Sequence, residues 1–134
     1  FTMGRADYQR QYEPILYGWP DGSHRHWCGD RDQGDVWQIK KPQKNDLHPT
    51  MKPVELVERA IRNSSRPGQL VLDPFGGSGT TLIAAEKAQR RAALIELDPQ
   101  YVDVIVRRWQ EWTGKRGVRE ADGVQYGAEA ISHM

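Results

Sequence analysis

The sequence has little of what marks membrane, secreted or metal-cluster proteins. Cys28 is its single cysteine, so the chain cannot form an internal disulfide or a cysteine cluster for a metal ion. No apolar run approaches the roughly 20 residues of a membrane-spanning helix, and the N-terminus lacks the basic and apolar regions of a signal peptide. We therefore expect no membrane segment and a reducing, cytoplasmic compartment.

An excess of charge of one sign is also lacking. The chain has 19 basic and 18 acidic residues, and its net charge of +1 gives no overall signal for nucleic-acid binding. Any contact with DNA must therefore come from a local group of side chains. The composition, with 37% hydrophobic and 28% charged residues over 134 positions, is typical of a single globular domain.

Residues 1–47 show little helical periodicity and are rich in glycine, proline, aspartate and aromatic residues. Two short stretches, 14–19 and 36–39, are bounded by turn residues and are predicted to form strands. The stretch between them, residues 21–35, is too polar to form a core. We expect it to be a solvated insert.

That insert contains one hint of a metal site. His24, His26 and Cys28 alternate along the chain, as zinc ligands sometimes do. A fourth ligand is not evident, so the solvated loop is the preferred interpretation and no metal is expected.

From residue 48 onward, helix and strand patterns alternate. Apolar residues recur at three- and four-residue spacing, while Asp98 and Gly114 stand where a helix cap and a helix stop belong. The order of elements is that of half an open parallel α/β sheet, followed by a loose polar tail. The expected elements are a helix beginning at Pro53 and ending at Arg66-Pro67-Gly68, a buried strand at 70–72, a helix at 80–89, a strand at 92–97, a helix at 99–113 with Trp109 and Trp112 in the core, and a tail at 115–134.

A glycine-rich turn, residues 73–81 (DPFGGSGTT), follows the first strand of this unit. Open α/β folds bind ligands at this edge of the sheet, where glycines allow close approach and the next helix presents free N–H groups. Glu96 lies at the end of the next strand, 20 residues after Gly76, where nucleotide-binding folds place a carboxylate for ribose hydroxyls. The pattern predicts a nucleotide-like ligand.

Three other interpretations of the turn fit less well. A phosphate-binding loop needs a lysine, and none occurs between Lys52 and Lys87. The dinucleotide fingerprint needs a third glycine where Leu82 stands. A tight turn that merely joins strand to helix would not explain the acidic strand end or the two threonines.

Residues 73–81 resemble the cofactor motif of S-adenosylmethionine-dependent DNA amino-methyltransferases, which modify adenine N6 or cytosine N4. Residues 48–53 (HPTMKP) resemble the motif that precedes it in the permuted group, in which the cofactor half follows the catalytic half. Residues 96–101 are similar to the acidic strand end of that family. Residues 7–18 and 27–39 resemble a prophage-type branch of the group.

The resemblance covers residues 1–114 and implies a fold and a division of the chain. The fold would be a partial doubly wound, Rossmann-like methyltransferase sheet with helices on its faces, which is a fragment of a larger domain. Residues 18–47 would be a short recognition-type insert, and residues 48–114 the cofactor-binding unit.

The resemblance also implies a binding site for S-adenosylmethionine. Glu96 would accept the ribose hydroxyls, and Lys52 would pair with the methionine carboxylate, although an ordinary solvated lysine is the alternative for Lys52. Asp98 is explained by its role as a helix cap. The residues expected to surround the cofactor are Thr50, Lys52, Pro53, Asp73, Pro74, Phe75, Gly76, Gly77, Ser78, Gly79, Thr80 and Glu96.

The sequence departs from the family in one respect. The family uses an Asp/Asn/Ser-Pro-Pro-aromatic segment to activate the base amine, but no two of the eight prolines here are adjacent. No catalytic residue is therefore expected in this chain, and Phe1 is interpreted as an internal residue of a longer enzyme. Two hypotheses follow: the cofactor half of a DNA methyltransferase, completed by an N-terminal half or a separate chain, or a catalytically silent module that binds S-adenosylmethionine or DNA.

Basic side chains gather just before the first motif. Lys40, Lys41 and Lys44 lie close together within residues 18–47, a stretch in which basic and acidic residues nearly balance. In the permuted group this position belongs to target recognition, so the resemblance implies that these lysines contact DNA phosphates. A solvated loop is the alternative.

Overall fold

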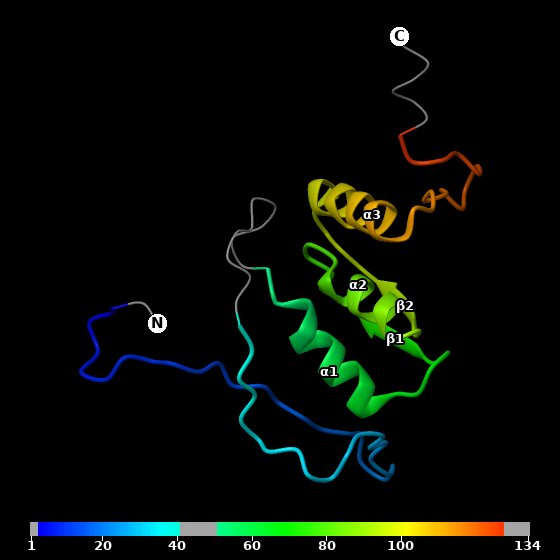
Figure 1. The fold of residues 1–134 in the computed structure, drawn as a ribbon. Helices are drawn as coiled ribbons and strands as arrows, with labels where there is room; N and C mark the ends of the chain where they lie inside the picture. The colour runs from blue at the N-terminus through cyan, green and yellow to red at the C-terminus, as the bar shows by residue number, and fades with distance from the viewer. Residues whose placement is uncertain (1–2, 41–50, 128–134) are drawn as a thin grey trace.

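Figure 1 shows the fold of the chain in a computed structural model that describes residues 3–40 and 51–127. The regular elements follow the order expected from the sequence: α1 (Val54–Ser64), β1 (Leu70–Asp73), α2 (Thr80–Lys87), β2 (Arg91–Leu94) and α3 (Pro99–Thr113). None of these helices is long and apolar enough to cross a membrane. Three of the candidate site residues named above, Lys41, Lys44 and Thr50, lie outside the described residues.

The two strands form a small parallel sheet. Leu70 pairs with Arg91 and Asp73 pairs with Leu94, so both strands end at the same edge. Beyond the strands, the Ile95 N–H donates to the Asp73 carbonyl (2.9 Å) and the Gly76 N–H donates to the Ile95 carbonyl (2.8 Å). The segments that leave β1 and β2 therefore stay side by side and bring the glycine turn close to Glu96.

One face of the sheet is covered by α1 and α2, which lie against each other (Figure 1). The small side chains of α2 allow this close packing. The buried cluster consists of Ile61 from α1 and Ala84, Ala85 and Ala88 from the α2 region, with Val71 and Ala92 of the strands packed against it.

The opposite face of the sheet is exposed, which corrects the expectation of a buried strand. Successive residues of a strand point to opposite faces. Val71 therefore reaches the helices, whereas Leu70 and Leu72 point away and are 58% and 64% exposed. No element in the described part of the chain covers that face.

The predicted strands at 14–19 and 36–39 are absent, because neither stretch pairs with another strand of the described residues. Instead, Tyr17 contacts the rings of Trp19 and Trp27, with centroids 5.6 and 6.2 Å away. The prediction of a strand at 92–97 is also too long. Pairing ends at Leu94, opposite the last residue of β1.

The two ends of α3 are as predicted. The Asp98 carboxylate accepts from the Gln100 N–H (2.9 Å), and Gly114 ends the helix with φ of +72°. Trp109 is half-buried and donates from Nε1 to Glu86 (2.9 Å), but Trp112 is 55% exposed beneath the Lys87 ammonium, so its placement in the core was wrong.

Residues 115–127, which follow α3, are not the loose tail that the sequence predicts. Val118 and Gln125 form an antiparallel bridge, and Arg119 pairs with Asp122 at 2.6 Å within the turn between them. The structure differs from the expectation because a backbone bridge and an ion pair form between residues within this segment.

Candidate functional site

The glycine turn, residues 76–79, lies between β1 and α2 at the edge where both strands end. It is closed by a hydrogen bond from the Gly79 N–H to the Gly76 carbonyl (2.9 Å). Gly79 has φ of +84°, a conformation that favours glycine. A Cβ atom at Gly76 or Gly79 would lie 3.2 or 3.0 Å from the side chain of Ile105. The turn therefore packs directly on α3 and has no room for side chains there.

Asp73 fixes the start of the turn. Its Oδ1 accepts from the Phe75 N–H (2.9 Å), and its Oδ2 accepts from the Thr81 hydroxyl (2.6 Å). The carboxylate thus ties the end of β1 to the first turn of α2. Phe75, between these anchors, is 86% exposed and presents its ring to the surroundings.

Glu96 contacts the same turn from the end of β2. Its Oε2 accepts from the Gly77 N–H (2.6 Å), and its Oε1 accepts from the Asp98 N–H (3.0 Å). The Asp98 N–H, and after it the Gly77 N–H, lower the pKa of Glu96 below its usual value, so the side chain is an anion at neutral pH. Each carboxylate oxygen can accept a second hydrogen bond, which leaves capacity for two ligand hydroxyls.

The N-terminus of α2 adds donors beside this carboxylate. No side chain caps the helix, whose N-cap is Gly79. The first N–H groups of such a helix are directed toward the space in front of it and favour an anion there. An anionic group and a pair of hydroxyls could therefore bind on the two sides of the turn.

The Lys52 segment reaches the turn through its backbone. The Thr80 hydroxyl donates to the Lys52 carbonyl at 3.3 Å, and Pro53 is the N-cap of α1 rather than its first helical residue. The Lys52 ammonium pairs with Glu13 at 2.6 Å, with the two side chains 50% and 71% exposed. A surface pair of this kind contributes at most about 1 kcal/mol, so Lys52 can exchange its partner.

Arg108 of α3 is a site residue that the sequence analysis did not single out. Its guanidinium donates to the Ser78 carbonyl (2.9 Å), to the Ser78 hydroxyl (3.3 Å) and to the Thr80 hydroxyl (3.3 Å). Burial lowers the pKa of Arg108 from its usual value. One sequence signal could have indicated Arg108. It lies three residues after Ile105, so both residues are on the same face of the helix.

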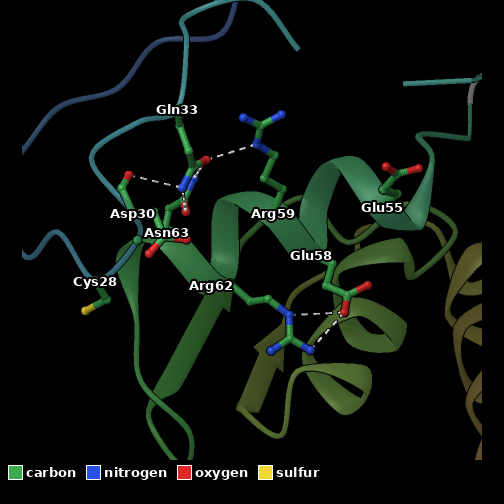
Figure 2. Close-up of a pocket in the computed structure, with 9 residues that line it drawn as sticks. Cys28, Asp30, Gln33, Glu55, Glu58, Arg59, Arg62 and Asn63 are labelled. Atoms are coloured by element: carbon green, nitrogen blue, oxygen red, sulfur yellow. Dashed lines mark hydrogen bonds and ion pairs between the residues drawn. The ribbon is translucent and has the colours of Figure 1, made fainter. Parts of the chain in front are cut away.

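A hollow of about 470 Å³ lies between α1 and the segment around residues 28–33, away from the glycine turn, and Figure 2 shows its lining. Gln33 and Asn63 donate to each other's side-chain oxygens at 2.7 and 2.9 Å, and Arg59 adds a bond to Gln33 (3.1 Å; Figure 2). None of its lining residues belongs to the glycine turn. We interpret these paired amides as the contact that holds the insert on α1.

The possible metal ligands and Lys40 lie outside the glycine turn. In residues 3–40 and 51–127, no three His, Cys, Asp or Glu side chains gather as metal ligands would, and His26 bonds Gln69 instead (3.1 Å). Lys40 is exposed, at the end of the first described range.

Comparison with known proteins gives a family match that covers most of the chain. A family model described as a DNA methylase matches residues 5–107. Among curated relatives, the type II methyltransferase M.Cfr9I of Citrobacter freundii is 39% identical over 61% of this chain, and M2.MboI of Moraxella bovis is 37% identical over 63%. The matched parts make up only 27% and 33% of those two proteins.

Solved structures support the same fold. The M1.HpyAVI complex with SAM matches with a TM-score of 0.53 and 30% identity, over 62% of this chain and 44% of that one. The cytosine-N4-specific PvuII DNA methyltransferase matches with a TM-score of 0.50 and 33% identity, over 55% of this chain and 30% of that one. The two-stranded sheet with its helices is therefore part of an α/β methyltransferase-like fold.

Proposed function

The chain belongs to the DNA methylase family of N6 and N4 methyltransferases, and from this we propose that it is the S-adenosylmethionine-binding part of a site-specific DNA methyltransferase. The enzyme would transfer a methyl group to an exocyclic amine of a DNA base, with adenine N6 favoured over cytosine N4. The observation that supports this best is the Glu96 carboxylate, which is ionised, is held against the glycine turn, and can accept one more hydrogen bond on each oxygen.

The described residues fit the two ends of this cofactor. Glu96 would accept the two ribose hydroxyls, while the free N–H groups at the start of α2 would bind the methionine carboxylate. Lys52 would leave Glu13 to approach that carboxylate, and the exposed Phe75 ring would cover one side. When bound, the cofactor supplies the electrophilic methyl group. Thr50 completes the proposed set.

Methyl transfer requires residues that this chain does not supply. The family's Pro-Pro segment is absent from the sequence, and the matched part spans about a third or less of its curated relatives. We propose that an N-terminal half or a separate chain provides the catalytic segment. The exposed outer face of β1, with Leu70 and Leu72, is the surface that helices of the missing part would cover, as helices cover both faces of a doubly wound sheet.

DNA is the proposed partner of the complete enzyme, with Lys40, Lys41 and Lys44 on its phosphates. A role in restriction–modification, a prophage origin and a cytoplasmic location belong to the same proposal. Digestion of the methylated DNA to nucleosides decides which base is modified, because N6-methyladenine and N4-methylcytosine nucleosides separate by chromatography.

The decisive experiment is titration of the 134-residue chain with S-adenosylhomocysteine in a calorimeter. Saturable binding that weakens about tenfold or more in the Glu96→Gln variant supports the proposal. Equal binding by wild type and variant contradicts the site, and no binding by the wild type contradicts cofactor binding by this chain. Labelled methyl transfer by the complete protein separates an enzyme from the alternative, a silent binding module.

A further inference from the structure

Arg108 connects α3 to the glycine turn directly and to the Lys52 segment through Thr80. Its guanidinium reaches the Ser78 carbonyl and the hydroxyls of Ser78 and Thr80, all within 3.3 Å. Ile105, one helical turn earlier, lies under Gly76 and Gly79. The turn thus has an apolar support and a polar one from a single helix face, although 30 residues separate Arg108 from Ser78.

The contact with Thr80 directs that hydroxyl. A guanidinium has donors and no acceptor, so the Thr80 oxygen must accept from it and use its own proton elsewhere. That proton goes to the Lys52 carbonyl at 3.3 Å. Arg108 therefore sets the orientation of the group that joins the glycine turn to the Lys52 segment.

The charge of Arg108 is not neutralised by a side chain. Among the described residues, none of the ion pairs involves Arg108, and its partners are a carbonyl and two hydroxyls. A half-buried cation behind the first turn of α2 adds to the positive potential of that helix end. Both effects favour an anionic group in front of the turn.

We propose that Arg108 is a positioning residue, which holds the glycine turn and, through Thr80, the Lys52 segment at the separation that binds the methionine end of the cofactor. The ligand in this statement rests on the proposed function. The claim that Arg108 fixes the geometry of the turn is independent of that function, because it concerns only contacts within the chain.

The test compares Arg108→Met with Arg107→Met in the 134-residue chain. Both variants lose a cation and keep an unbranched apolar side chain. Within residues 3–40 and 51–127, however, the Arg107 guanidinium donates only to a carbonyl of its own helix, that of Asp103. Amide hydrogen exchange then reports on the turn through Gly79, whose N–H donates to Gly76, and on the helix through Ala88, whose N–H donates to Ala84.

We expect Gly79 exchange to become about tenfold faster in Arg108→Met than in Arg107→Met, with Ala88 exchange equal in the two variants, since a missing hydrogen bond to a charged group costs about this factor. Affinity for S-adenosylhomocysteine should fall by about the same factor, and Arg108→Lys should restore part of it. Adding Thr80→Val to Arg108→Met should lower the affinity little further, because both changes break the same hydrogen bond between Arg108 and Thr80.

Equal Gly79 exchange in the two methionine variants overturns the proposal, and so does an equal acceleration at Gly79 and Ala88, which is the result of general destabilisation. If the wild type binds no S-adenosylhomocysteine, the proposed function fails, while the exchange comparison still decides the role of Arg108. Full additivity of Thr80→Val and Arg108→Met also contradicts it.

Discussion

Gly77 donates its backbone N–H to Glu96 Oε2 at 2.6 Å, so the turn after β1 and the acidic residue after β2 are in direct contact. The contact gives the carboxylate one structural role and leaves it able to take a second. It stabilises the turn through Gly77, and it retains lone pairs for a ligand. A change at Glu96 will therefore affect both the loop and whatever binds beside it.

The first prediction concerns this carboxylate. Glu96→Gln keeps the side-chain size, but its amide has one acceptor oxygen for the Gly77 and Asp98 N–H groups and carries no charge. We expect affinity for S-adenosylhomocysteine to fall about tenfold or more. Calorimetry with Glu111→Gln, a change at an exposed residue of α3, serves as the matched control. Equal affinities in the two variants would remove Glu96 from the site.

The pH dependence of stability gives a second test of Glu96. Because its pKa in the folded chain is below the usual 4.5, the carboxylate stabilises the fold above pH 4.5, and this contribution is lost as the pH falls through the lower folded value. The difference in urea midpoint between wild type and Glu96→Gln should therefore be constant near neutrality and shrink below pH 4.5. A difference that persists unchanged in acid contradicts the assignment.

The third prediction separates two reasons for glycine. Gly79 and Gly123 both have positive φ, but a Cβ at Gly79 would meet Ile105 at 3.0 Å, whereas a Cβ at Gly123 would meet nothing within 4 Å. Both alanine variants should lose about 1–2 kcal/mol from backbone strain. Gly79→Ala should lose about 1–3 kcal/mol more from overpacking, measured by urea unfolding. Equal losses would mean that Ile105 moves aside freely.

Elements that depend on local signals could be predicted from the sequence, and those that depend on distant partners could not. Asp98 and Gly114 mark the ends of α3 because capping involves neighbouring residues. The exposure of Leu72 depends on what covers the outer face of the sheet, which no pattern within β1 records. The strand assigned to residues 14–19 failed for the same reason, since strands require a pairing partner.

The candidate site divides in the same way. The motif and its spacing named Glu96 and the glycine turn. They did not name Arg108, because its contacts with Ser78 and Thr80 span about thirty residues of sequence and follow from how α3 packs. The pairing of Lys52 with Glu13 was likewise invisible to a spacing argument.

The fourth prediction is that the 134-residue chain alone does not methylate DNA. It lacks the Pro-Pro segment with which the family activates the base amine. Transfer of labelled methyl groups from S-adenosylmethionine to unmethylated DNA should stay at the level of a Glu96→Ala control. A complete family member run in parallel shows that the assay works. Transfer above the control level would show that this chain has a different catalytic group.

The fifth prediction concerns the lysines before the first motif. In the complete protein, replacing Lys40, Lys41 and Lys44 with alanine should weaken DNA binding equally for matched and mismatched sites, because phosphate contacts carry no sequence information. The slope of log affinity against log salt should flatten by roughly 0.9 for each phosphate that the variant no longer neutralises. Cofactor affinity should not change. If the triple variant keeps the wild-type slope, these lysines do not contact phosphates and belong to a solvated loop.

The packing of Ile105 beneath Gly76 and Gly79 has a consequence for exchanging parts between related enzymes. A graft of residues 73–81 alone would transfer the glycines but leave behind the side chains shaped to receive them. Residues at 76, 79, 105 and 108 should accordingly change together among homologues, with a larger residue at 105 tolerated only where the turn stands further from the helix. The smallest portable unit runs from Asp73 to the end of α3.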